Sequence, residues 1–170
     1  MKFFNFFFLI LILLYSFLSV AKSNDNLAYI NLDNVIENSI YGKKVLSEIK
    51  LLNQENIQKL KNMENEIKSD ENELNKKKNI LSQKEFEKEF KKFEQKLSEF
   101  RKIKNEMTSD FKIQKNEKLN NFFLKINPII QEYMDEKSID ILFRQENIFI
   151  GKTSADITSI IIEIINNKVN

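Results

Sequence analysis

The tripeptide Gly151-Lys152-Thr153 contains the residue types that end a nucleotide-binding P-loop. In that loop an earlier glycine and flexible neighbours let backbone amides surround the phosphates. Glu146 occupies the position of the earlier glycine and would bring a carboxylate against them. The residues between, Asn147–Ile150, favour an extended strand. We therefore predict that the tripeptide ends a strand and that the chain binds no nucleotide.

Other catalytic sites and metal sites lack the necessary side chains. The chain has 0 His and 0 Cys, which removes the usual nucleophile–base pairs and the zinc ligands. Carboxylates are plentiful, but nearly all stand beside lysines in the charged middle of the chain, and no segment has the spacing of a calcium loop. The sequence predicts a protein that is not an enzyme, with no catalytic residue, no metal site and no cofactor.

The N-terminus has the pattern of a secretory signal peptide. Lys2 precedes an apolar run over residues 3–20, and small residues follow at Ser19 and Ala21. This order of charge, apolar run and small residues is typical of an export leader. We predict a leader over residues 1–21, cleaved after Ala21 or after Ser23. The alternative is an uncleaved membrane anchor, because the run is nearly long enough to span a bilayer.

The charge balance argues against nucleic acid as a partner. The chain has 27 Lys and Arg against 25 Asp and Glu, a formal net charge of +2, and the predicted leader carries only Lys2. Nucleic-acid binding usually requires a clearly basic face. Since cysteine is missing, no disulfide can stabilise the exported chain, which must rely on packing or assembly.

Residues 43–137 form a long charged segment without glycine, in which apolar residues recur at steps of three and four. This spacing predicts helices packed along a narrow seam. Ser82 and Glu85 have the spacing of a capping box that starts a second helix. We predict an antiparallel helical hairpin, an arm with its tip near residues 77–82. Pro128 should kink or restart the second helix.

The two ends of the chain, residues 22–42 and 138–170, predict a small head that contains strands. Residues 27–32 read as a strand, after which Asp33 would cap a short helical turn and Gly42 would let the chain change direction. Residues 139–150 read as a β-hairpin that turns at residues 145–147. The predicted fold class is therefore α+β, a helical arm on a head of short strands.

A last helix is predicted after Asp156, whose carboxylate would cap it. Its isoleucines follow the spacing of one buried face. They are Ile157, Ile160, Ile161, Ile164 and Ile165.

The segments LAYINLDNVIENSIYGKK (27–44) and IDILFRQENIFIGKTSADIT (139–158) resemble the two ends of the Skp/OmpH family of periplasmic chaperones. The charged middle is similar to the hairpin arm of that family. The resemblance implies a homotrimer whose strands close a small barrel, with three arms around a cavity. That cavity would hold unfolded outer-membrane proteins in the periplasm, without ATP.

Trimer formation also has a physical reason. A few short strands and helices cannot bury a core alone, because sheet edges and apolar faces would remain in water. The candidate trimer core consists of apolar residues in the predicted strands. They are Ala28, Ile30, Leu32, Ile139, Ile141, Phe143, Ile148 and Ile150.

Two features of the arm are candidate contacts for unfolded clients. The first is a series of large apolar residues on the returning helix, which either fill the helical seam or leave apolar surface toward the cavity. They are Phe86, Phe90, Phe93, Phe100, Met107 and Phe111. The second is the tip cluster Lys76, Lys77 and Lys78. Such lysines are usually solvated, and the alternative is weak contact with an anionic membrane surface or an acidic client.

A different class of protein fits the arm but not the head. A structural coiled-coil protein of the envelope, anchored by residues 3–20, would need only helices. Because the chain devotes both ends to strand-forming segments, we favour the chaperone interpretation.

Overall fold

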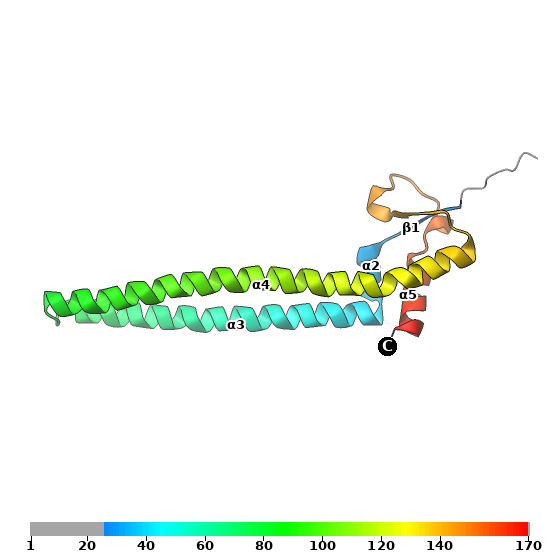
Figure 1. Cartoon of the computed structure of the whole chain (residues 1–170). Helices are drawn as coiled ribbons and strands as arrows, with labels where there is room; N and C mark the ends of the chain where they lie inside the picture. Colours follow the sequence, from blue (N-terminus) through cyan, green and yellow to red (C-terminus); the bar gives the residue numbers. More distant parts are fainter. Residues whose placement is uncertain (1–25, 170) are drawn as a thin grey trace, which may run out of the picture.

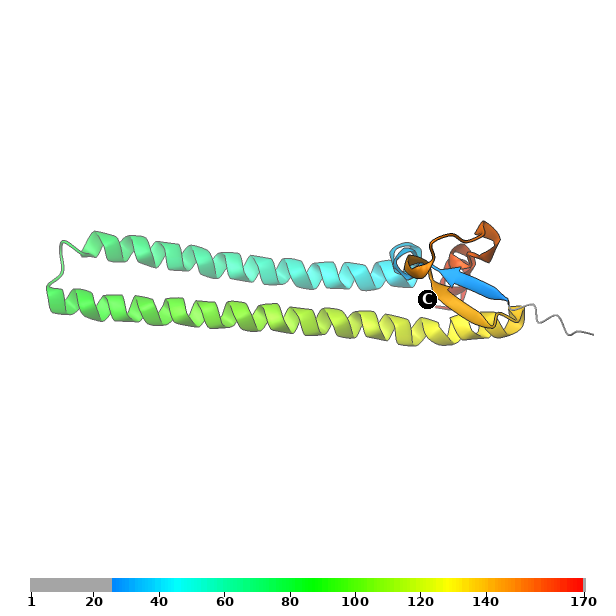
Figure 2. The same ribbon diagram turned by 90° about the horizontal axis from the view of Figure 1, so that it is seen from above.

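The computed structural model describes residues 26–169; the predicted leader lies outside them. These residues form a long two-helix arm on a small head (Figures 1 and 2). Helix α3 (Ile40–Lys77) runs out to the tip and α4 (Gln83–Lys137) returns beside it. The 38 residues of α3 span about 57 Å, at about 1.5 Å of rise per residue.

Serine residues occupy the N-cap positions of both long helices. Ser39 is the N-cap of α3, and its hydroxyl accepts a hydrogen bond from the Gly42 amide at 3.1 Å. Ser82 is the N-cap of α4, and its amide donates to Glu85 Oε2 at 3.2 Å. These bonds satisfy polar groups that a helix terminus leaves free.

Pro128 lies inside α4, which does not restart there. Proline has no amide proton, so one backbone hydrogen bond of the helix is missing at this turn. Figure 1 shows the last turns of α4 directed away from the straight line of the arm. The missing bond gives this bend a physical cause.

The head contains a two-stranded parallel sheet with two short helices beside it. Strand β1 (Leu27–Ile30) pairs with β2 (Ile141–Arg144) in the register Leu27 to Ile141 and Ile30 to Arg144. On the other side of β1, the Ile157 amide donates to the Tyr29 carbonyl at 3.0 Å. Helix α2 (Leu32–Asn38) follows β1, and α5 (Thr158–Lys168) ends the chain.

The predicted β-hairpin over residues 139–150 is wrong. After β2 the chain forms the short helical turn η1 (Gln145–Asn147), and residues 148–150 belong to no strand. Strand β2 pairs instead with β1, which is far away in the sequence. Gly151-Lys152-Thr153 therefore ends no strand; Thr153 begins a second short turn, η2 (Thr153–Ala155). Three consecutive apolar residues look like a strand, but a strand also needs a partner with free hydrogen-bonding groups.

Three predicted helix boundaries differ from the structure. Asn31, not Asp33, caps α2, and its side chain accepts from the Asn34 amide at 2.8 Å. The N-cap position of α5 is Ile157, while Asp156 stands one residue earlier and accepts from the Thr158 amide at 2.9 Å. The arm begins at Ile40, three residues before the predicted start, because Ser39 caps α3.

Gly42 has a different role from the predicted change of direction. It lies within the first turn of α3, where α2 packs closely against the helix. A Cβ atom built on Gly42 would stand 2.0 Å from the carbonyl oxygen of Ile36. The site requires glycine because a side chain would collide with backbone.

The apolar core lies where the arm meets the head. Residues of α2, α4 and α5 converge there with no exposed surface, among them Val35, Phe122, Ile126, Ile161 and Ile165. Tyr41 at the start of α3 stacks on Phe122 with 5.6 Å between ring centroids. Burial of these side chains fixes the base from which the arm projects.

Candidate functional site

The large apolar residues predicted as client contacts mostly line the seam between α3 and α4. Phe90 is 43% exposed and stacks on Phe86 at 6.2 Å. The other members are half-buried: Phe86, Phe93, Phe100, Met107 and Phe111. Their burial agrees with the interpretation that the rings fill the seam, and it leaves Phe90 as the most open ring of the series.

Other apolar side chains of the arm are more exposed than this series, and the sequence analysis did not single them out. Leu51 and Ile57 on α3 are 55% and 56% exposed, and Ile113 and Leu124 on α4 are 53% and 62% exposed. These four residues do not fall on the three- and four-residue steps that define the seam. An apolar residue outside those steps is the sequence signal that could have identified them.

A groove of about 220 Å³ lies between the two helices at mid-arm. Its apolar lining comes from both helices: Ile57, Leu60, Met107 and Phe111. Its polar lining consists of Asn53, Asn56 and Thr108, all of them uncharged. The groove brings two members of the predicted client-contact series, Met107 and Phe111, together with Ile57 of α3.

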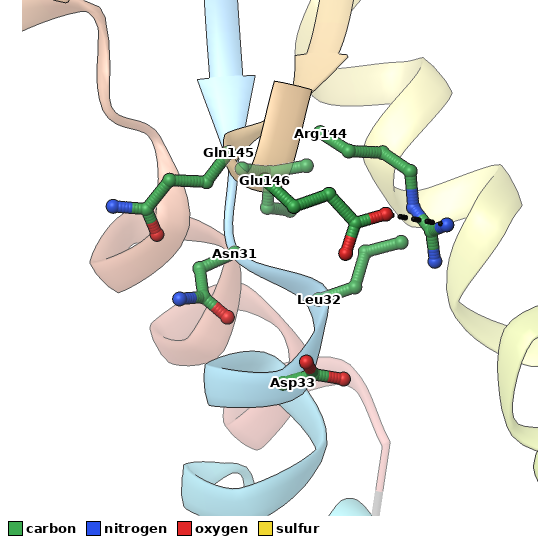
Figure 3. A pocket seen from close by; sticks show the side chains of 7 residues that line it. Asn31, Leu32, Asp33, Arg144, Gln145 and Glu146 are labelled. Carbon is green, nitrogen blue, oxygen red and sulfur yellow. Dashed lines mark ion pairs between the residues drawn. The ribbon is translucent and has the colours of Figure 1, made fainter. Parts of the chain in front are cut away.

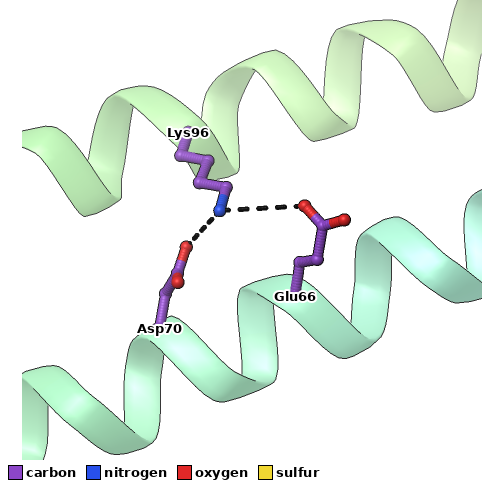
Figure 4. A network of polar contacts seen from close by, with 3 residues as sticks. All are labelled: Glu66, Asp70 and Lys96. Atoms are coloured by element: carbon purple, nitrogen blue, oxygen red, sulfur yellow. Dashed lines mark hydrogen bonds and ion pairs between the residues drawn. The ribbon is translucent and has the colours of Figure 1, made fainter.

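Ion pairs connect the two helices at other points of the arm. Lys96 on α4 contacts Asp70 on α3, and its Nζ lies 3.9 Å from Glu66 Oε2 (Figure 4). The hydrogen bond to Asp70 raises the pKa of Lys96. Nearer the head, Lys118 Nζ and Glu48 Oε2 are 2.7 Å apart, and this hydrogen bond lowers the pKa of Glu48. All of these side chains are substantially exposed, so each pair contributes little to stability.

The tip presents cations next to one open apolar side chain. Lys76, Lys77 and Lys78 are exposed, and within residues 26–169 none of them forms an ion pair. Ile80 in the turn is 79% exposed. This combination keeps contact with an anionic surface a prediction for the tip.

The predicted trimer-core residues fall into two groups in the single chain. Ala28 and Ile30 are buried, and Leu32, Ile139 and Ile148 are half-buried. The others remain open to solvent: Ile141 at 49%, Phe143 at 39% and Ile150 at 84%. Phe149, which the prediction omitted, is 98% exposed. The head of one copy thus leaves a large apolar surface uncovered.

Beside this surface, a hollow of about 250 Å³ opens where both strands end (Figure 3). Arg144 and Glu146 form an ion pair at 2.9 Å on its wall, with Asn31, Leu32 and Asp33 opposite. Both side chains of this pair are more than half exposed, at 56% and 58%, so the pair contributes little to stability.

A metal cluster and a membrane-spanning helix are both absent from the part of the chain that the structure describes. Residues 26–169 contain no cluster of three or more side chains suited to hold a metal ion. None of the helices in this range is long and apolar enough to cross a membrane.

Comparisons with known proteins agree with this architecture. The family model of the outer membrane protein (OmpH-like) group matches residues 26–165. A crystal structure from Caulobacter crescentus CB15, assigned as an OmpH-like outer membrane chaperone, superposes with a TM-score of 0.78 at 15% identity and covers 88% of each chain. At this identity the likeness shows a shared fold. No curated protein sequence matches the chain. Since the family match spans most of its length, the chain belongs to the OmpH-like outer membrane protein family.

Proposed function

We propose that this protein is an ATP-independent periplasmic chaperone that holds unfolded outer-membrane proteins and prevents their aggregation. Three copies would join through their heads, and three arms would surround a shared cavity. The observation that carries the proposal is the uncovered head, in which Phe149 and Ile150 are 98% and 84% exposed. A small head has few apolar side chains to bury, so leaving two of them in water costs it stability. Such surface is typical of an assembly interface.

The arm supplies the second support. Its helices bury few residues between them and present apolar and charged side chains along their length. Many weak contacts spread over three arms would bind an unfolded chain and still release it, because multivalency multiplies modest affinities. Holding of this kind needs no catalytic residue and no nucleotide.

The export leader and the trimer are tested together by one measurement. We expect the mass of the purified protein in solution to equal three copies of a chain that has lost residues 1–21. A variant with Phe149→Ser and Ile150→Ser should sediment as a single copy at the same concentration. A processed wild-type chain that sediments as a single copy would contradict the proposed assembly.

Client holding is tested by an aggregation assay. An unfolded outer-membrane β-barrel protein is diluted from urea, and light scattering is followed with and without the processed protein at stoichiometric amounts. We expect scattering to be suppressed without added ATP. A structural envelope protein, the alternative function, would leave scattering unchanged.

The tip lysines suggest an additional contact with anionic membranes. Each lysine near such a surface contributes about 1 kcal/mol, and exposed Ile80 would enter the head-group region. Vesicles with anionic lipid should bind the wild-type protein at low salt and should not bind a variant with Lys76, Lys77 and Lys78 replaced by glutamine. Equal binding of both proteins would exclude the tip.

A further inference from the structure

The two faces of the flat helical arm differ in the ion pairs that join α3 to α4. In an α-helix each residue is rotated about 100° from the one before, so residues just before and just after a seam position lie on opposite faces. In two antiparallel helices, residues that follow seam positions share one face. Residues that precede seam positions share the other.

The ion pairs between the helices all lie on the face before the seam. Glu66 precedes buried Ile67, and Glu48 precedes buried Ile49. Their partners, Lys96 and Lys118, stand just before half-buried Leu97 and Leu119. A second hollow, of about 210 Å³, opens here, and its walls are dominated by charges: Asp70, Glu73, Lys77, Glu89, Lys92 and Lys96.

The mid-arm groove opens on the other face. Ile57 follows seam residue Asn56, and Thr108 follows seam residue Met107. Thr108 already donates a hydrogen bond to the Lys104 carbonyl at 2.7 Å. No charged residue lines this groove, although the helices around it are dense in lysine and glutamate. Charged side chains such as Lys61, Glu64 and Lys104 also follow seam positions on this face, but none of them lines the groove. The groove itself therefore suits a neutral apolar ligand.

We propose that this groove is a binding subsite for an extended, uncharged segment of an unfolded outer-membrane protein. The inference rests on the proposed holding function and names where the arm grips. An apolar client side chain enters between Ile57, Leu60, Met107 and Phe111. The client backbone carries unpaired amides and carbonyls, and the side-chain amides of Asn53 and Asn56 both donate and accept hydrogen bonds. The groove lining and the proposed client segment are both uncharged, so neither must give up a charge interaction with water on binding.

Ile57 lies at the rim of the groove and is open to contact with a client side chain. An isoleucine that is 56% exposed loses water contact only when something covers it. Covering it removes apolar surface from water, which favours binding without any charge interaction. Capture at the groove should therefore depend little on salt, in contrast to capture by exposed lysines.

The matched control for Ile57 is Leu51. It lies on the same helix and is 55% exposed, but it precedes seam residue Leu52 and so faces away from the groove. Ile57→Asn and Leu51→Asn are compared in the full-length processed protein. The probe is a urea-unfolded outer-membrane β-barrel protein, titrated by fluorescence. We expect Ile57→Asn to weaken capture about three- to tenfold, and Leu51→Asn to change it less than about twofold.

A second measurement reports occupancy directly. Because the chain has 0 Cys, Asn53→Cys carries a single environment-sensitive dye at the groove, and Leu51→Cys carries it on the opposite face. We expect the client to shift the emission of the dye at residue 53 to the blue, at low and at high salt, and to leave the dye at residue 51 unchanged.

The outcomes separate the subsite from the function as a whole. If wild-type protein captures the client but Ile57→Asn and Leu51→Asn behave alike, or both dyes respond alike, the subsite is overturned and holding stands. A steep loss of capture with salt would also overturn it and assign the grip to charges. If wild-type protein captures nothing, the proposed function itself fails.

Discussion

The base of the molecule and the outer arm bury their apolar residues to very different extents. At the base, Val35, Phe122 and Ile161 have no exposed surface, because several helices surround them. In the outer arm the most buried side chains are Ile67 and Leu74, each 8% exposed, and most of the seam is only half-buried. Two helices cover one stripe of each other and leave the rest to solvent.

This difference means that the base contributes most of the stability, whereas the arm provides most of the exposed apolar surface. Burial supplies most of the free energy of folding, so the base should hold the molecule together. The arm gains less from its own packing and keeps apolar atoms available for other molecules. Substitutions of the same kind should consequently have different effects in the two regions.

The largest effect should come from Phe122→Ala, compared with Phe93→Ala. Removing the fully buried ring leaves a cavity at the base and should reduce the free energy of unfolding by about 3–5 kcal/mol. The same change at half-buried Phe93 should lower it by less than half as much. Urea unfolding followed by circular dichroism measures both. Equal losses would mean that the arm is as tightly packed as the base.

Gly42→Ala should have the next largest effect. The new methyl group would meet the Ile36 carbonyl oxygen at 2.0 Å, so α2 and α3 must separate. We expect a loss of about 2 kcal/mol or more, although alanine favours helix more than glycine does. Ser47→Ala, on the exposed side of the same helix, is the control and should change stability by only a few tenths of a kcal/mol. A stable Gly42→Ala protein would argue against the close approach of these helices.

Replacing Phe90, Phe93 and Phe100 together by leucine tests whether aromatic side chains of the arm bind the client, while the arm stays folded. Leucine keeps apolar contact in the seam, so helicity and the mass of the proposed trimer should persist, with a loss of about 1–2 kcal/mol in the free energy of unfolding. Capture of an unfolded outer-membrane protein should weaken several-fold if exposed aromatic surface binds it. Unchanged capture would remove these three rings from the client site.

The smallest effect should be that of pH. With 0 His, the described chain has no side chain that normally titrates near neutrality. Lys118 lowers the pKa of Glu48, so this contribution is present above pH 4.5 and is lost as pH falls through the lowered value. Asp70 raises the pKa of Lys96, so that contribution is present up to pH 10.5 and is lost as pH rises beyond it. Urea midpoints should agree at pH 6, 7 and 8.

A midpoint that moves strongly between these pH values would reveal a coupled group that the exposed ion pairs do not explain. Lys118→Gln is a suitable control at lower pH. It should move the acid limb of the stability curve toward higher pH, because the pKa of Glu48 then rises toward its ordinary value.

The arm was predictable from the sequence because helical periodicity is a local signal. Apolar residues at steps of three and four identified both helices, and Ser82 with Glu85 located the start of α4. The first strand, the short helix after it and the terminal helix also followed from local patterns.

The head was predicted less well because its sheet depends on distant partners. β1 and β2 are separated by the whole arm, and nothing in either segment specifies parallel pairing. Ile148–Ile150 have strand-like composition, yet they pair with nothing in the described chain. The mid-arm groove was missed for a related reason: the facing of Ile57 depends on the register between two helices, which the spacing along one helix does not reveal.

The unbroken course of α4 has a mechanical consequence. This helix runs from the tip to the head without a break, about 80 Å for its 55 residues. Ser138, with a left-handed φ of 52°, is the short bend between it and the sheet, and β2 begins at Ile141. A sideways load on the tip would therefore reach β2 through the bend at Pro128 and the joint at Ser138, and β2 would pass it to β1, its partner in the sheet.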